Sequence, residues 1–270
     1  VALALATFFG PAAETIEPRE LGGGIGHASY LVTLAEQGYV LKLKHGPAPG
    51  LLTLEEEFGL LKVAATAGVA AEPVRMDVAT RALLIRYLQR ATPLTEAGTR
   101  EPANISRLAA LLRRLHAITA PLRAFAPREH AQSYVAAAAK RAPLTPAEQG
   151  MAKELHALAA DYAVRYPPSA ACHNDLVAAN VLDTGELVLI DFEYAARAAP
   201  ILDLASLAAM NEYTENDRRA LLDAYYGSSG APVSPANLTD VVRLVRLLAY
   251  FWALALPPQL RAPNARYLRV

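Results

Sequence analysis

The sequence predicts an α+β protein with two lobes, a small β-rich N-terminal lobe and a larger, mainly helical C-terminal lobe. The chain has 270 residues, 53% of them hydrophobic, which is enough for a large core or for two lobes. Before about residue 90, short apolar segments are separated by glycine and polar residues, as strands are. Beyond it, apolar residues recur at helical spacing. We expect lobes over residues 1–89 and 90–270, with the boundary inside the polar run 89–99.

The N-terminal lobe is expected to contain two helices and five strands. A helix over residues 1–9 is ended by a Gly-Pro pair. A second helix is expected over about residues 54–67, because Thr53 can cap it, acidic residues fill its first turn and Gly68 follows it. The segments read as strands are residues 16–20, 30–35, 39–44, 74–77 and 82–88.

A glycine-rich turn joins the first two strands and is a candidate phosphate-binding loop. Gly24 and Gly26 have no side chains, so backbone N–H groups there can approach phosphate oxygens closely. The turn is not a Walker A loop, because no Gly-Lys-Ser/Thr follows. Glycine-rich turns are common, and one alone is a weak indication of phosphate binding.

The strand over residues 39–44 places two lysines on one face. Strand alternation directs Val40, Lys42 and Lys44 to one side and apolar residues to the other. Lys44 lies near the strand end and is interpreted as a solvated strand terminus. The acidic run Glu55–Glu57 in the following helix is explained by the helix dipole alone.

The C-terminal lobe is expected to be built mainly of helices. Leu108, Leu111, Leu112 and Leu115 form a stripe at helical spacing, and neighbouring arginines face away from it. His116 follows this stripe and is interpreted as a core or interface histidine. Further helices are expected over residues 130–140 and 146–165, from 203, over 214–227 and over 235–256.

Three oxygen-bearing side chains within residues 172–194 indicate a metal and phosphate site. Asp175 and Asn180 lie in a segment without periodicity, which we interpret as a loop. Two apolar runs then flank a turn over residues 183–186 and predict a hairpin that returns Asp191 beside Asn180. Oxygen ligands at this density suit Mg²⁺, which usually binds carboxylates together with substrate phosphates.

The spacing of these residues matches the template for phosphoryl transfer. A loop of the form H-x-D-x-x-x-x-N offers an Asp to the nucleophilic hydroxyl and an Asn to Mg²⁺, and the Asp of D-F-G holds Mg²⁺. His173, Asp175 and Asn180 fall on the first pattern, and the D-F-E run from Asp191 falls on the second. Loop capping explains any one of these residues but not the whole set.

These motifs resemble the choline/ethanolamine kinase branch of the aminoglycoside phosphotransferase superfamily, which has a protein-kinase-like fold. The resemblance is carried by H-N-D at 173–175, I-D-F-E-Y at 190–194, P-I-L-D-L-A at 200–205 and N-E-Y at 211–213, and it covers nearly the whole chain. It implies a bilobal kinase-like fold and phosphoryl transfer from ATP, with Mg²⁺, to an alcohol. A protein kinase is not expected, because no A-P-E segment follows Asp191.

The resemblance also implies the roles of the residues in the C-terminal lobe. Asp175 is then the catalytic residue that accepts the proton of the hydroxyl. His173 braces its loop, and Asn180 and Asp191 hold Mg²⁺. Asp203 supports the loop from the next helix.

The nucleotide site is implied by the same resemblance. ATP is expected to meet Gly24, Gly26, Ser29, Lys42, Glu57, Tyr87 and Leu88. Lys42 brings positive charge to the phosphates, and Glu57, with Glu56 as the alternative, keeps Lys42 aimed. Backbone groups at the hinge between the lobes meet adenine, and Gln89 stands there where many relatives have glycine.

The expected acceptor is choline or ethanolamine, which aromatic faces and carboxylates would hold. The candidates for this pocket are Glu193, Tyr194, Glu212 and Trp252, together with Tyr213 and Tyr250. Tyr194 matches the tyrosine of I-D-F-E-Y, and Trp252 resembles a tryptophan of the family's C-terminal helix. Core packing is the alternative explanation for Tyr250 and Trp252.

Three other functions stay open. Thiamine kinase is close, because thiamine has a cationic ring and a primary alcohol. An aminoglycoside kinase is less expected, since no dense acidic run follows Asp191. A non-catalytic binding protein with this fold is the third, although every metal and phosphate position is filled.

Composition bounds the partners and the compartment. Lysine plus arginine and aspartate plus glutamate both total 26, which argues against a nucleic-acid partner. The one cysteine, Cys172, excludes an internal disulfide and suits a reducing compartment. The apolar run at residues 1–6 is too short to span a bilayer and has no basic start. We expect a cytoplasmic protein without a membrane partner, and the sequence does not indicate its oligomeric state.

Overall fold

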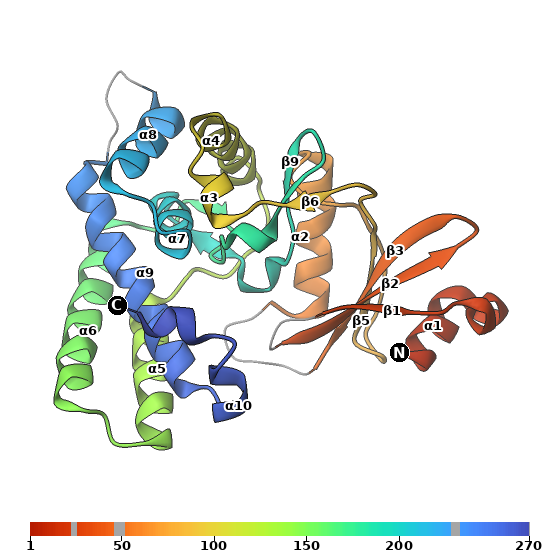
Figure 1. Ribbon diagram of the computed structural model, residues 1–270, viewed down its shortest axis with the longest axis horizontal. Coiled ribbons are helices and arrows are strands. Elements are labelled where there is room, and N and C mark those ends of the chain that lie inside the picture. Colours follow the sequence, from red (N-terminus) through yellow and green to blue (C-terminus); the bar gives the residue numbers. More distant parts are fainter. Residues whose placement is uncertain (23–25, 46–51, 228–232, 270) are drawn as a thin grey trace.

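The computed structural model describes residues 1–22, 26–45, 52–227 and 233–269 (Figure 1). A five-stranded sheet lies at one end of the molecule, and most of the helices gather at the other (Figure 1). This is the α+β, bilobal arrangement that the sequence predicts. In the described ranges, no helix combines the length and the apolar character needed to cross a membrane.

The N-terminal sheet is antiparallel, with the strand order β1-β2-β3-β5-β4. Its strands are β1 (Arg19–Gly22), β2 (His27–Leu34), β3 (Gln37–Lys44), β4 (Pro73–Asp77) and β5 (Ala82–Arg86). All five predicted strands are present. β1 begins three residues later than expected, because a 3₁₀ helix (η1, Gly10–Thr15) precedes it and Pro18 has no N–H to donate to a sheet.

Two helices cover opposite faces of this sheet. Leu84 of β5 belongs to the small core beneath α1 (Ala2–Phe9), whereas its neighbour Leu83 belongs to the larger core that includes α2 (Leu54–Thr66). Consecutive strand residues point to opposite faces, so α1 and α2 lie on different sides. Both helices were predicted.

The C-terminal part is mainly helical, as predicted. Its helices are α3 (Glu96–Thr99), α4 (Pro102–His116), α5 (Pro127–Arg141), α6 (Pro146–Arg165), α7 (Ile201–Met210), α8 (Glu215–Tyr226), α9 (Pro235–Ala255) and α10 (Pro258–Arg261), followed by the 3₁₀ helix η4 (Ala265–Leu268). The leucine stripe of α4 is buried. The sequence did not predict α3, α10 or η4, since four residues are too few to show a period.

Two small sheets flank the loop over residues 173–180, which is the expected catalytic loop. The predicted hairpin is present as β8 (Val181–Asp183) and β9 (Leu187–Leu189), and β6 (Thr92–Pro93) extends it. The second sheet pairs β7 (Ala170–Cys172) with β10 (Ala196–Ala198) and was not predicted, because its alanines carry little strand signal. The loop over residues 173–180 therefore starts at the end of β7 and finishes at the start of β8.

The hydrophobic core continues across the expected lobe boundary. The larger buried cluster contains Leu60 and Leu83 as well as Leu108 and Leu244. A backbone hydrogen bond of 2.7 Å, from the N–H of Leu189 to the carbonyl of Val69, also joins the two parts. The sheet and the catalytic hairpin are thus held in contact by packing as well as by the chain connection.

Candidate active site

The catalytic loop holds Asp175 and Asn180 in direct contact. The side-chain nitrogen of Asn180 donates to the carboxylate of Asp175 at 3.0 Å and to its main-chain oxygen at 2.9 Å. This leaves the amide oxygen as the atom of Asn180 that can bind a cation. Asn180 is buried, and the short 3₁₀ helix η2 (Ala178–Asn180) positions it.

His173 is fully buried and both of its ring nitrogens are engaged. Its Nδ1 accepts the N–H of Asp175 at 3.3 Å, so the ring proton is on Nε2, which donates to the carbonyl of Ile190 at 2.9 Å. The ring also lies edge-on to Phe192, with centroids 4.7 Å apart. His173 thus ties the catalytic loop to the D-F-E segment, which is the bracing role expected of it.

Asp203 on α7 clamps the start of the loop. Its two carboxylate oxygens accept the backbone N–H groups of His173 and Asn174, both at 2.8 Å. Ser206, one turn further along α7, accepts the N–H of Leu176 at 3.2 Å. The loop is therefore held by main-chain contacts that do not depend on its own side chains.

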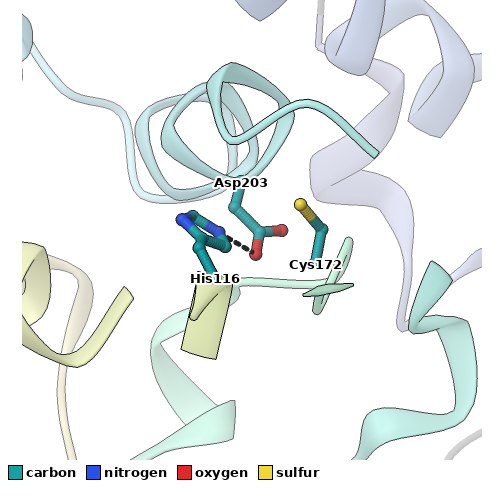
Figure 2. A group of neighbouring side chains, drawn as sticks. All are labelled: His116, Cys172 and Asp203. Atoms are coloured by element: carbon teal, nitrogen blue, oxygen red, sulfur yellow. Dashed lines mark hydrogen bonds and ion pairs between the residues drawn. The ribbon is translucent and has the colours of Figure 1, made fainter. Parts of the chain in front are cut away.

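A second cluster lies behind this clamp. Figure 2 shows His116 hydrogen-bonded to Asp203, at 3.1 Å, with the thiol of Cys172 beside them. The three groups are close enough to hold an ion, but His116 also bonds to the hydroxyl of Tyr225 at 2.6 Å. Burial, and then Asp203, raise the pKa of the Cys172 thiol, which opposes the thiolate that a metal needs. We interpret the cluster as a brace for the catalytic loop.

The hairpin brings Asp191 back to the loop as predicted. The N–H of Ile190 donates to the carbonyl of Asn180 at 3.0 Å, which fixes the end of the hairpin beside the loop. Asp191 has a left-handed backbone, with φ 66°, and its carboxylate accepts a 2.6 Å hydrogen bond from Lys42. The expected lysine and the expected aspartate are thus in contact across 149 residues of sequence.

Lys42, Glu57 and Lys44 form a buried charge cluster. Glu57 pairs through one oxygen with Lys42, at 2.9 Å, and through the other with Lys44, at 2.5 Å. Burial would lower the pKa of Lys42, but Glu57 and then Asp191 outweigh it and raise that pKa. Burial would raise the pKa of Glu57, but Lys42 and Lys44 lower it. Lys42 and Glu57 therefore stay charged near neutral pH.

The interpretation of Lys44 as a solvated strand terminus is wrong. Its side chain is 8% exposed, and its ammonium also donates to the carbonyl of Leu52 at 2.9 Å. Leu52, which precedes α2, thus lies at the end of β3. Strand alternation puts Lys42 and Lys44 on one face, and this pattern was the signal that could have shown the burial of Lys44.

The choice between Glu57 and Glu56 is explained by the start of α2. Thr53 and Glu56 form a capping box, in which the Glu56 carboxylate accepts the N–H of Thr53 at 2.8 Å. Glu56 also pairs with Arg123, at 3.1 Å. Its side chain is thus used at the helix end, while Glu57, about 100° further around the helix, faces the lysines.

The glycine-rich turn is described only in part. Gly24 lies outside the described residues. Gly26 lies against Glu193, since a Cβ added at Gly26 would stand 2.9 Å from that carboxylate. Ser29 is in β2, directly opposite Lys42 of β3. The close approach at Gly26 is what the absence of a side chain allows.

His27 is a site residue that sequence reasoning missed. It is buried, and its Nδ1 lies 3.4 Å from Glu193 and 4.0 Å from Asp191. It links the strand after the glycine-rich turn to the D-F-E segment. Its place in that turn was the only signal for it.

The residues expected to form the hinge, Tyr87 and Leu88, directly follow the strand β5. The strand β5 ends at Arg86, and the N–H of Tyr87 donates to the carbonyl of Gly38 at 3.1 Å. That N–H is therefore already used and is not open to adenine. The carbonyl of Tyr87 and the N–H of Leu88 are the backbone groups that remain for the nucleotide base.

Asp175 opens onto a cavity of about 650 Å³. Burial, together with Asp191 and Glu193, raises the pKa of Asp175, although His173 and Asn180 lower it. The net direction makes Asp175 a stronger proton acceptor than an exposed aspartate.

Aromatic side chains line this cavity. Tyr194 and Trp252, both predicted for the acceptor pocket, are joined by Tyr134, Phe125 and Tyr267, which were not predicted. Trp252 and Tyr267 meet edge to face, with centroids 5.7 Å apart. Burial, and then Asp175, raise the pKa of Tyr134 to about 12, so it is an uncharged phenol. Tyr267 belongs to the unpredicted η4, which explains why the sequence did not indicate it.

Of the four other residues predicted for the acceptor pocket, one lines the cavity and three do not. Glu193 lines the cavity, but Glu212 is exposed and does not. Tyr213 is buried and donates from its hydroxyl to the carbonyl of Thr99. Tyr250 bonds to Glu148 at 3.1 Å and does not line the cavity, so packing is the better explanation for it. The tight turn after α7 carries Glu212 outward, with φ 54°.

The oxygen set at the loop fits a magnesium ion. The free amide oxygen of Asn180, the carboxylate of Asp191 and the carboxylate of Glu193 are hard ligands on adjoining segments. His27 adds one nitrogen at their edge. These residues suit an ion that is also bound by phosphate oxygens.

Known proteins match most of this chain. A model of the phosphotransferase enzyme family matches residues 17–237. Protein LicA of Haemophilus influenzae is 24% identical over 211 residues, which are 75% of this chain and 61% of LicA. The chain thus spans less than two thirds of that relative's length.

Solved structures share the fold over nearly the full chain. Choline kinase LicA from Streptococcus pneumoniae has a TM-score of 0.80 at 20% identity, covering 99% of this chain and 95% of that one. A choline/ethanolamine kinase family protein from Mesorhizobium loti has a TM-score of 0.76 at 21% identity, covering 100% and 94%. A LicA structure with AMP and an ADP-bound aminoglycoside phosphotransferase also align, with TM-scores of 0.75 and 0.64.

Proposed function

We propose that this chain, which belongs to the phosphotransferase enzyme family, transfers the γ-phosphoryl group of ATP to the hydroxyl of a small cationic alcohol. Choline or ethanolamine is the foremost acceptor. One observation carries the proposal: the Asp175–Asn180 pair lies beside Asp191, and Asp175 opens onto a cavity with aromatic walls.

Asp175 is proposed to orient the acceptor hydroxyl and to take its proton. The raised pKa of this buried carboxylate supports that role, because it favours proton acceptance. The hydrogen bond from Asn180 and the brace at His173 hold the carboxylate in place. Positioning of this kind supplies much of the rate in phosphoryl transfer, whose transition state is loose.

Lys42 and Glu57 are proposed to position the nucleotide phosphates. Lys42 carries a positive charge to the edge of the site, and Glu57 fixes its direction. Asn180 and Asp191, with Glu193 nearby, would hold Mg²⁺, which neutralises phosphate charge when bound.

The cation of the acceptor is proposed to lie against aromatic faces. Tyr194, Trp252 and Tyr267 offer such faces, and Glu193 offers a carboxylate. Thiamine is the second candidate acceptor, because its cationic ring and primary alcohol suit the same walls.

The proposal is tested by Asp175→Asn, assayed for Mg²⁺-dependent phosphorylation of choline, ethanolamine and thiamine. We expect turnover to fall at least ~100-fold while ATP still binds, since general base help is lost and the shape is kept. Asp161→Asn, the same change at an exposed carboxylate of α6 that does not line the cavity, is the matched control. Near-normal turnover in Asp175→Asn would remove Asp175 from the reaction.

A further inference from the structure

The acceptor cavity is much larger than choline. Its volume is about 650 Å³, within the range of roughly 300–1,000 Å³ that holds drug-sized ligands. Choline has seven non-hydrogen atoms, and at roughly 30 Å³ for a water-sized group it fills no more than about a third of this space. The end lined by Asp191 belongs to the proposed Mg²⁺ site, and much of the remaining space would face a second part of the acceptor.

The negative charge of the cavity is confined to one cluster. The carboxylates that line it are Asp175, Asp191 and Glu193, and His27 lies within 4.0 Å of both Asp191 and Glu193. The basic residues that line the cavity are Arg123 and His130. Beyond this cluster, no described residue of the lining has a carboxylate that could pair with a second cationic centre.

The wall formed by α7, α9 and the C-terminal segment is uncharged. Met210, Val245, Leu248 and Ala249 contribute apolar surface there, and Trp252 and Tyr267 contribute aromatic surface. The small side chain of Ala249 leaves room beside its larger neighbours. This surface suits an apolar or aromatic body and gives a polycation nothing to pair with.

From these observations, we propose that the acceptor is an alcohol with a single cationic centre and an apolar body of about ring size. The cation lies near the carboxylate cluster and the body lies against the α7–α9 wall. This inference rests on the proposed function and deepens it: choline would be accepted, but a relative of choline with such a body would be the better acceptor. It separates this chain from enzymes that phosphorylate polycationic acceptors.

Four acceptors test the inference, all with the same hydroxyethyl-dimethylammonium group. The fourth substituent on nitrogen is methyl (choline), butyl, benzyl or a propyl chain ending in a second trimethylammonium. Each buried methylene is worth roughly fourfold in binding. We expect KM to fall at least ~10-fold from methyl to benzyl, and the dication to have a KM at least ~10-fold above that of the benzyl compound.

The variant Ala249→Phe tests the position of the body. Phenylalanine fills the space beside the α9 wall, so the ratio of kcat/KM for benzyl over methyl should fall at least ~5-fold. Ala236→Phe makes the same change at an exposed position of α9 and should keep the wild-type ratio. Ala249→Leu, a smaller addition, should give an intermediate ratio and serves if the larger variant does not fold.

The outcomes separate this inference from the proposed function. If choline is phosphorylated with a kcat/KM equal to or above that of the benzyl compound, the size inference is wrong and the phosphotransferase stands. If no compound is phosphorylated but calorimetry still ranks benzyl tightest, the cavity inference stands and the reaction is wrong. Preference for the dication, or absence of binding by all four, overturns the inference.

Discussion

Glu57 is shared by two buried lysines, and this sharing sets the charge balance around Lys42. A carboxylate paired with Lys42 alone would neutralise it. Lys44 provides a second positive charge on the same carboxylate, so the three side chains together offset the negative charge of Asp191, which also pairs with Lys42. Lys44 also bonds to the carbonyl of Leu52, whose N–H donates to the carbonyl of Glu193 at 2.9 Å. The cluster is thus connected to the D-F-E segment.

Lys44→Met is expected to lower both stability and turnover. Leaving the Leu52 carbonyl and half of Glu57 without a donor costs about 1–3 kcal/mol in the free energy of unfolding. Turnover should fall while Lys44→Arg retains more of it, because arginine keeps the charge. Urea unfolding and steady-state kinetics measure the two effects, and Lys62→Met on the exposed side of α2 is the control. Equal behaviour of the Lys44 and Lys62 variants would contradict the role given to Lys44.

At the scale of elements, the β8–β9 hairpin is the part that delivers Asp191. Arg107 on α4 holds its turn through a two-point pair with Asp183, at 2.7 and 2.8 Å, and through the carbonyl of Gly185 at 2.9 Å. Hydrogen bonds from Arg107 and from the N–H of Gly185 lower the pKa of Asp183 to about 2. A helix of the C-terminal part therefore fixes the direction of the strand that ends at the site.

The Arg107–Asp183 pair should stabilise the chain in a pH-dependent way. Because the folded pKa of Asp183 lies below its ordinary value of 3.8, the contribution is present above about pH 4 and is lost as pH falls towards 2. Asp183→Asn should lower the free energy of unfolding by about 1 kcal/mol at pH 7, since the pair is partly exposed.

Urea unfolding at pH 7 and at pH 3 measures this difference. The effect of Asp183→Asn should shrink at the lower pH. It should also largely vanish in an Arg107→Gln background, where the partner is already absent. A loss that is the same at both pH values would mean that the ion pair does not stabilise the hairpin.

At the scale of the whole molecule, the shared core joins the sheet to the helices. Leucines of α2 and β5 lie in the same buried cluster as those of α4 and α9. The strand order and the packing of α2 therefore place Lys42, with its partner Glu57, against Asp191. A site built from the N-terminal sheet and the C-terminal helices keeps its geometry only while these two parts stay packed together.

One cooperative unfolding transition is expected from this shared core. Trp252 and Cys172 are the one tryptophan and the one cysteine of the chain, and Cys172 is fully buried. Urea curves from far-UV circular dichroism, Trp252 fluorescence and thiol labelling of Cys172 should coincide. The first method reports on the whole chain and the other two on the C-terminal part. Separate transitions would show that the sheet and the helices unfold independently.

The sequence by itself determined the longer helices, the strands of the N-terminal sheet and the local half of the site. The hairpin that returns Asp191 to Asn180 is formed by neighbouring residues, and the helices show their own caps and periods. Such features depend on short segments, whose spacing constrains their geometry directly. The pairing of Lys42 with Glu57, only 15 residues apart, was expected from the family resemblance alone, because the helix dipole by itself accounted for the acidic run.

Only the tertiary structure decided which distant residues meet. His27 reaches Glu193 across 166 residues, and Tyr267 reaches the cavity from a segment too short to show a period. Lys44 is buried because another segment covers its strand, and Glu212 is turned away by the backbone after α7. The burial and orientation of these side chains follow from packing between elements. The residues adjacent to them in sequence do not indicate that packing.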